Sequence, residues 1–161
     1  MRIDRVVVNA SPLITLFRSG QFDLLPSLFN HIIVPEAVWE EVVIDTWNDP
    51  AARQLGEQRW ANRQTVEVSP RVAVWNLGAG ETAVLSFALA QPSYRAMVDD
   101  REARRCARTL GLRTLGTAGM LVLAKRRGLI ASVEIGVVRL RDAGLWLSDE
   151  VVRVLLRQAG E

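Results

Sequence analysis

The chemistry that this sequence suggests rests on polar side chains placed directly after short apolar runs. Asp99 and Asp100 follow the run at 96–98, and Asn9 follows the run at 6–8. Adjacent carboxylates repel each other, so a positive group is expected beside Asp99 and Asp100. Carboxylate oxygens are the ligands that Mg²⁺ and Mn²⁺ prefer, and sites of this kind commonly serve phosphoryl chemistry.

Glu81 is the most informative single acid. In a helix over Glu81–Ala90 its side chain shares a face with Val84, Leu85 and Ala88, and that face should be buried. A buried carboxylate needs a partner, because an unpaired buried charge costs several kcal/mol. Either the N-terminus of its own helix or a metal ion could meet this need, and the flanking glycines suit both.

Two further glutamates, Glu40 and Glu41, lie on a helix that Pro35 opens. The apolar face of this helix leaves both of them on its flanks, so helical periodicity does not decide which one turns towards the sheet edge. Taken singly, each is also compatible with an ordinary exposed helix acid.

Several other kinds of site are excluded by the residues that are missing. The chain has one histidine, His31, and one cysteine, Cys106, so a zinc site of the Cys/His type and an intrachain disulfide are ruled out. The only lysine, Lys125, is not part of a glycine-rich phosphate loop. A phosphoacceptor receiver domain would need its acidic pair after the first strand, whereas the pair in this sequence, Asp99 and Asp100, follows a strand late in the chain. We interpret His31 as structural and Cys106 as an inert core residue.

The charge is unevenly distributed, although the net charge is only +2. Residues 1–94 carry more acidic than basic side chains, and residues 95–161 carry more basic ones. A helix over Arg101–Leu110 would bury its small residues and turn four arginines outward: Arg101, Arg104, Arg105 and Arg108. Such a segment is compatible with binding to a polyanion or with a solvated helix face.

Strands alternating with helices are expected to position these residues. We predict strands over Arg5–Val8, His31–Val34, Tyr94–Val98 and within Gly111–Leu115, with a possible strand at Thr65–Val68. We predict a first helix with Ser11 as its N-cap and Pro12 in its first turn. Further helices are predicted over Pro35–Asp45, Glu81–Ala90, Arg101–Leu110, Thr117–Arg127, Val133–Asp142 and Asp149–Gln158. This order favours a parallel sheet that binds its ligand at the carboxyl ends of the strands.

The length of 161 residues and the average composition indicate one globular domain. The longest apolar stretch, Ala118–Ala124, is far shorter than the ~20 residues needed to span a bilayer, and the N-terminus lacks a signal-peptide core. With a single cysteine, the expected location is the cytoplasm.

Six segments in this order resemble a PIN domain, and more narrowly the uncharacterised branch related to VapC-type toxins of toxin–antitoxin pairs. The segments are VVVNASPLI at 6–14, IIVPEAVWEEV at 32–42, LGAGETAVLSFAL at 77–89, VDDREARRCARTLGL at 98–112, GTAGMLVLAKRRGLI at 116–130 and LRDAGLWLSDE at 140–150. The resemblance implies an α/β class fold, a three-layer α/β/α sandwich with a central, mainly parallel sheet. It implies one PIN-like domain over 1–161, with the C-terminal helices of 132–161 as an extension of it.

The resemblance also implies a Mg²⁺- or Mn²⁺-dependent endoribonuclease site. The family pattern Pro-x-x-Val-x-x-Glu selects Glu41 over Glu40. The implied catalytic positions are Asn9, Glu41, Glu81, Asp99 and Asp100, of which Glu41, Glu81 and Asp100 would bind the metal. Ser11 and Thr117 would support the site, and the arginines of 101–108 would bind RNA.

Asn9 departs from the family, which usually has Asp at this position. Asn keeps an oxygen ligand but has no negative charge. Two hypotheses therefore stand. One is a metal-dependent ribonuclease that serves as the toxin of a toxin–antitoxin pair, and the other is a PIN-like module that binds nucleic acid or protein with weak or no nuclease activity. The expected partners are RNA, an antitoxin protein and a second copy of the chain. The last helix has an apolar face, Val151, Val152, Leu155 and Leu156, that could close the core or form a dimer interface.

Overall fold

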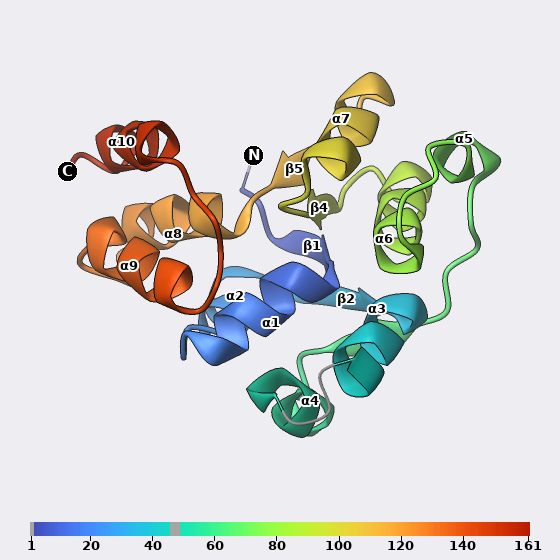
Figure 1. The fold of residues 1–161 in the computed structure, drawn as a ribbon, viewed down its shortest axis with the longest axis horizontal. Coiled ribbons are helices and arrows are strands. Elements are labelled where there is room, and N and C mark those ends of the chain that lie inside the picture. Colours follow the sequence, from blue (N-terminus) through green and yellow to red (C-terminus); the bar gives the residue numbers. More distant parts are fainter. Residues whose placement is uncertain (1, 46–48) are drawn as a thin grey trace.

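The computed structural model describes residues 2–45 and 49–161. Its centre is a five-stranded sheet in the order β3-β2-β1-β4-β5, and all four strand pairs are parallel (Figure 1). The strands are β1 (Arg5–Val8), β2 (His31–Pro35), β3 (Asn62–Gln64), β4 (Arg95–Met97) and β5 (Thr114–Leu115). The central strand β1 is fully buried over its last three valines, as expected for a parallel sheet covered on both faces.

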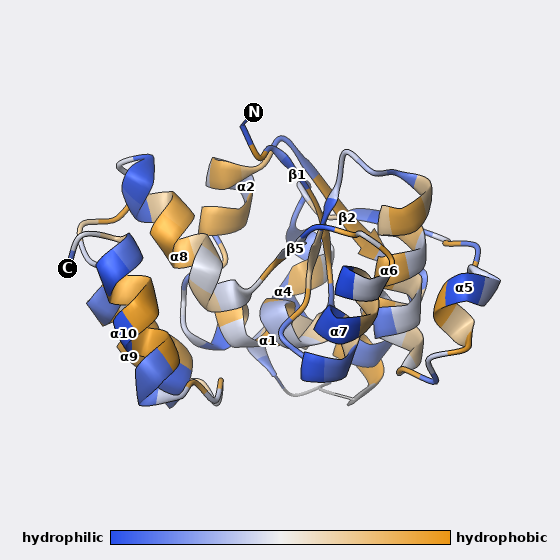
Figure 2. Cartoon of the chain, turned by 90° about the horizontal axis from the view of Figure 1, so that it is seen from above, coloured by the Kyte–Doolittle hydropathy of each residue, from blue (hydrophilic) through white to orange (hydrophobic). Residues whose placement is uncertain are grey.

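Helices cover both faces of this sheet and produce the predicted three-layer sandwich (Figure 2). The longer helices are α1 (Ala10–Arg18), α6 (Ala79–Ala90), α7 (Arg101–Thr109), α8 (Thr117–Arg126), α9 (Val133–Asp142) and α10 (Asp149–Gln158). The shorter ones are α2 (Leu24–Leu28), α3 (Glu36–Glu40), α4 (Pro50–Gln54) and α5 (Pro70–Ala73), with a π-helical turn η1 (Glu41–Asp45) and a 3₁₀ turn η2 (Leu55–Glu57). Helix α6 packs on β1, β2 and β4 on one face of the sheet. Helices α9 and α10 pack against α8.

Most predicted elements are confirmed, and two predictions are wrong. No strand forms at Thr65–Val68. The edge strand is β3, which pairs Ile33 with Asn62 and Pro35 with Gln64. Strand β2 ends at Pro35, so residues 65–68 have no neighbouring backbone with which to pair.

The first helix does not use Ser11 as its N-cap. The chain passes from β1 directly into α1, and Asn9 occupies the N-cap position without a capping hydrogen bond from its side chain. Pro12 then lies within the first turn, where a missing N–H group costs nothing. The N-terminus of α1 thereby directs Asn9 to the edge of the sheet.

The helix predicted over Pro35–Asp45 is present but changes type. It is α-helical to Glu40 and continues as the π-helical turn η1 from Glu41. Within residues 2–45 and 49–161, no helix combines the length and the apolar character needed to cross a membrane.

Candidate active site

The candidate site lies where the carboxyl ends of β1, β2 and β4 meet. Asn9 follows β1 directly, Asp99 and Asp100 follow β4, and Glu41 follows β2 after one short helix. Helix α6 lies across these three strands and brings Glu81 in its first turn to the same edge. The topology therefore gathers residues that are up to 91 positions apart in the sequence.

Asn9 contributes a buried oxygen that has no partner. The residue is only 5% exposed, and its Oδ1 atom is buried without a hydrogen bond. Its backbone amide donates to the carbonyl of Met97 over 3.1 Å, which fixes the residue between β1 and β4. Buried polar atoms are rarely left unsatisfied, so this oxygen is available to a ligand or to an ordered water at the mouth of the site.

Glu41, and not Glu40, reaches this edge. The Gly80 amide donates to Glu41 Oε1 over 2.9 Å, whereas Glu40 is exposed. A Cβ atom on Gly80 would lie 2.5 Å from Glu41 Oε1 and 3.1 Å from Asn9 Oδ1. Only a glycine therefore lets α6 approach both oxygens this closely.

Glu81 is half-buried and accepts a hydrogen bond from the Gly78 amide over 3.3 Å, so the N-terminus of its own helix is one of its partners. Burial raises the pKa of the Glu81 carboxyl, and the negative charges of Asp100 and Glu41 raise it further, against the lowering effect of the Gly78 amide. Glu81 thus lies close enough to both Asp100 and Glu41 for their charges to oppose its ionisation. A positive charge placed among them would reverse this repulsion.

The two adjacent aspartates face different partners. Thr117 donates to Asp99 from both its amide (2.9 Å) and its hydroxyl (2.6 Å), so Asp99 is held by the N-terminus of α8. Asp100 is the N-cap of α7 and accepts from the Ala103 amide over 2.9 Å. Helix N-termini therefore supply the positive groups that the sequence required beside this pair.

The donor set fits a hard divalent cation, although the carboxylates are not already gathered around one point. Among the residues that the structure describes, no group of three or more His, Cys, Asp or Glu side chains is close enough to hold a metal ion. Glu41, Glu81 and Asp100 each use one oxygen to accept a backbone amide. Each of these carboxylates has a second oxygen besides the one in that bond, and Asn9 Oδ1 accepts no hydrogen bond. Oxygen ligands of this kind suit Mg²⁺ and Mn²⁺.

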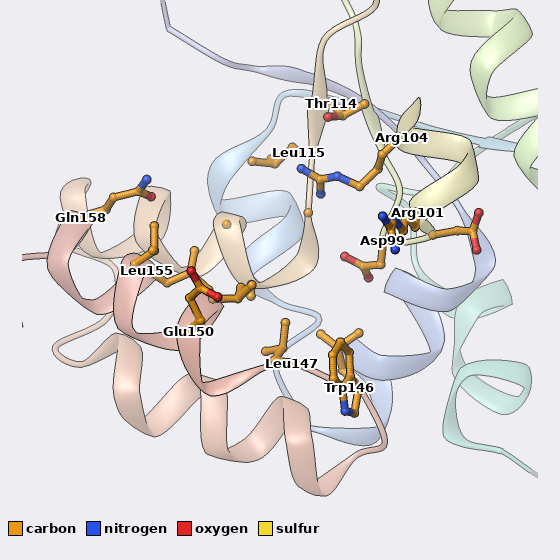
Figure 3. A pocket seen from close by; sticks show the side chains of 17 residues that line it. Asp99, Arg101, Arg104, Thr114, Leu115, Trp146, Leu147, Glu150, Leu155 and Gln158 are labelled. Carbon is orange, nitrogen blue, oxygen red and sulfur yellow. The ribbon is translucent and has the colours of Figure 1, made fainter. Parts of the chain in front are cut away.

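A groove of about 900 Å³ extends from Asp99 and Asp100 towards α10 (Figure 3). Its polar wall contains Arg101 and Arg104, and its apolar wall includes Leu155 and the indole of Trp146. Trp146 is 83% exposed, although the residues on either side of it are partly buried. The sequence gives only a weak indication that Trp146 is exposed beside a groove, namely its position as a lone Trp between Gly144 and the N-cap of α10.

The arginines of α7 divide into two groups. Arg101, Arg105 and Arg108 are exposed, as predicted. Arg104 is not turned fully outward, because its guanidinium folds back along the helix and its Nη1 donates to the Val98 carbonyl over 3.5 Å. Arg104 and Asp99 both approach Gly116, so this arginine lies against the acidic edge.

The remaining predictions concern residues outside the site. Cys106 is completely buried and burial raises the pKa of its thiol, which agrees with an inert core residue. The apolar face of α10 only partly closes the core: Val152, Leu155 and Leu156 are half-buried, while Val151 is 45% exposed. Ser11 is exposed on α1.

Comparison with known families supports the resemblance to a PIN domain. The family whose sequence model matches this chain is described as PIN domain, and the match covers residues 5–161. Neither the comparison with curated proteins nor the comparison with solved structures produced a match.

Proposed function

Because the chain belongs to the PIN-domain family, we propose that the protein is a divalent-metal-dependent ribonuclease that hydrolyses RNA phosphodiester bonds. PIN domains generally use divalent metal ions. The observation that carries the proposal is that the edge with the buried, unpartnered Asn9 Oδ1 also holds Glu81, whose pKa is raised by burial and by the charges of Asp100 and Glu41. This edge of the sheet holds an excess of negative charge and oxygen ligands that a cation would satisfy.

In this proposal Glu41, Glu81 and Asp100 hold the cation and Asn9 adds a neutral oxygen. A bound Mg²⁺ or Mn²⁺ would offset charge on the reacting phosphate and lower the pKa of water. Asp99 is a positioning residue, because Thr117 fixes both of its oxygens and thereby fixes the turn that presents Asp100. Asn9 cannot take up a proton as a carboxylate can, so any proton acceptor among the four is Glu41, Glu81 or Asp100.

The groove offers a path for the RNA strand. Arg101 and Arg104 on its polar wall carry charges suited to phosphates, and the exposed indole of Trp146 offers a surface on which a base could stack (Figure 3). Arg105 and Arg108 continue the positive charge along α7. An unpaired strand suits this arrangement, because a base within a duplex does not expose a free face.

The direct test is cleavage of a single-stranded RNA in the presence of Mn²⁺. We expect activity from the unmodified protein, loss of about 10²-fold or more in Glu81→Gln and Asp100→Asn, and little change in Glu40→Gln. Glu40 is a matched control because it is exposed and lies next to Glu41. Cleavage by the unmodified protein that is no faster than cleavage by Glu81→Gln would reject the proposal.

A second candidate function is favoured by Asn9 itself: a PIN-like module that binds nucleic acid or protein without cutting. An amide lowers the negative charge of the site relative to the Asp usual in the family, and weaker metal binding follows. Calorimetry with Mn²⁺ separates the two candidates. Tight binding by the unmodified protein supports the nuclease, whereas binding that appears only in Asn9→Asp supports the module.

We also propose that the nuclease acts as the toxin of a toxin–antitoxin pair, held inactive by an antitoxin protein. The support is the resemblance of segments such as LGAGETAVLSFAL at 77–89 to that branch of the family. Induced expression in a bacterial host should arrest growth, and Glu81→Gln should not. Equal growth with both proteins, at equal levels of soluble protein, would count against the toxin role.

A further inference from the structure

A second concentration of arginines lies at the opposite edge of the sheet, where the strands begin. Arg5 is the first residue of β1, Arg95 is the first residue of β4, and Arg113 immediately precedes β5. These three strands are neighbours, with Val6 opposite Arg95 and Ala96 opposite Thr114. By this register Arg95 lies opposite Arg113 on one face of the sheet, and Arg5 extends from the other face beside Tyr94 at the same end of the strands.

These arginines line a hollow rather than a convex surface. Arg2, Arg5, Arg95 and Arg113 contribute to the walls of a cavity of about 760 Å³, within the range typical of small-ligand sites. Asp4 is the only acidic residue in the lining. The cavity thus has a strong excess of positive charge.

The arginines of this cluster form no direct pair with an acidic side chain in the described chain. In the part of the chain that the structure describes, none of the four arginines forms an ion pair or donates a side-chain hydrogen bond. The guanidinium of Arg5 lies over the ring of Tyr94, 5.7 Å from its centre. Arg127, by contrast, donates to the backbone carbonyls of Leu28 and Ile3.

Arg95 is the most constrained member of the cluster. It is half-buried, and both burial and the neighbouring charge of Arg113 lower the pKa of its guanidinium. A guanidinium remains protonated at neutral pH, so the repulsion between Arg95 and Arg113 persists unless an anion is bound. The geometry of a guanidinium fork matches that of phosphate oxygens.

We propose that this cavity, the strand-start arginine site, binds phosphate groups. The site is separate from the carboxylates, because the two lie at opposite ends of the same parallel strands. The phosphates could belong to a stretch of RNA outside the cleavage region or to a free polyphosphate. Both share the chemistry that recognises them, namely two or more anionic oxygens held by adjacent arginines.

The experiment measures binding without divalent ions, so that it does not depend on nuclease activity. Fluorescence anisotropy with a labelled single-stranded RNA and calorimetry with inorganic pyrophosphate would be performed on the unmodified protein and on Arg95→Gln/Arg113→Gln. The control is Arg153→Gln/Arg157→Gln, which removes the same charge from exposed positions on α10.

We expect the variant of the cluster to bind at least one of the two ligands about 10-fold or more weakly than the control does. For RNA, the slope of log Kd against log salt concentration should fall by about 1.4, since each phosphate contact on a single strand contributes about 0.7. Loss of RNA binding alone identifies the strand as the ligand, and loss of pyrophosphate binding identifies a free polyphosphate. Equal binding of both ligands by the two double variants overturns the proposal.

Arg113→Gln serves as a second variant because Arg113 is exposed and its replacement leaves the core untouched. It should weaken binding in the same direction even where the double variant is less stable. A normal melting temperature with unchanged affinity for both ligands would again contradict the site. Loss of metal-dependent cleavage would bear on the proposed nuclease and not on this inference.

Discussion

Replacing Asn9 with Asp places a negative charge where the structure has a buried amide oxygen without a partner. Asn9 Oδ1 and Glu41 Oε1 lie 3.1 and 2.5 Å from the point that a Cβ atom on Gly80 would occupy, so they are at most about 6 Å apart. Two unit charges at ~6 Å in an effective dielectric of ~20 repel by about 3 kcal/mol. We therefore expect the free energy of unfolding of the metal-free protein to fall by about 3 kcal/mol at pH 7.5.

For a chain of this length, a loss of ~3 kcal/mol corresponds to a melting temperature about 6–12 °C lower. The same charge should strengthen Mn²⁺ binding, because a carboxylate replaces an amide among the ligands. A ligand present at ~100 times its Kd adds about 2.7 kcal/mol of stability, so 1 mM Mn²⁺ should restore most of the loss if the Kd is near 10 µM. The gain from Mn²⁺ should be larger for the variant than for the unmodified protein.

The assay is thermal unfolding with and without MnCl₂ at fixed pH and ionic strength. The control is Asn62→Asp, the same chemical change at an exposed position on the edge strand β3. If Asn9→Asp melts at the temperature of the unmodified protein without metal and gains no more from Mn²⁺ than Asn62→Asp does, Asn9 Oδ1 does not face the carboxylates and the reasoning fails.

Three further predictions follow from the same contacts. The pKa of Glu81 is raised in the folded protein, so the metal-free protein should lose stability relative to Glu81→Gln as the pH rises above the ordinary glutamate range; parallel denaturation curves from pH 4 to 8 would contradict this. Gly80→Ala should displace the Glu41 carboxylate, lower the free energy of unfolding by about 1–3 kcal/mol in chemical denaturation and abolish the stabilisation by Mn²⁺. Gly56→Ala is the control, because its new Cβ would contact nothing within 4 Å, and it should leave the stabilisation by Mn²⁺ unchanged. Burial opposes ionisation of Glu161, but hydrogen bonds from Val133, Ser132, Lys125 and Glu134 lower its pKa to about 2. The unmodified protein should therefore be more stable than Glu161→Gln above about pH 5, and this difference in the free energy of unfolding should disappear as the pH falls towards 2. A difference that does not change with pH would refute this assignment.

Much of the candidate site could be predicted because the ends of buried strands can be recognised in a sequence. Apolar runs at 6–8 and 96–98 are each followed by a polar residue, and parallel strands bring such positions to one edge. The position of Glu81 in the first turn of a helix with a buried face also follows from residue spacing. These signals are local in the sequence, and the fold class alone predicts that the residues they mark lie close together.

The details that decide the chemistry depend on contacts between distant segments. Periodicity treats Glu40 and Glu41 alike, and the difference arises because η1 begins at Glu41 and α6 places Gly80 against it. The two bonds from Thr117 to Asp99 join positions 18 residues apart. The predicted strand at Thr65–Val68 was wrong for a similar reason, since the length of β2 controls where an edge strand can pair.

The central position of β1 has a consequence for how the protein is made. Its two neighbours are β2 and β4, so the first strand to be synthesised gains its second partner only after some 90 further residues. Pairings between distant segments form slowly, and a nascent chain exposes β1 on one side until residues 95–97 emerge. The carboxylates at 99 and 100, and Thr117 that holds one of them, emerge later still. A polypeptide that ends before residue 95 contains Asn9, Glu41 and Glu81 but lacks both β4 and Asp100, so it cannot assemble the site.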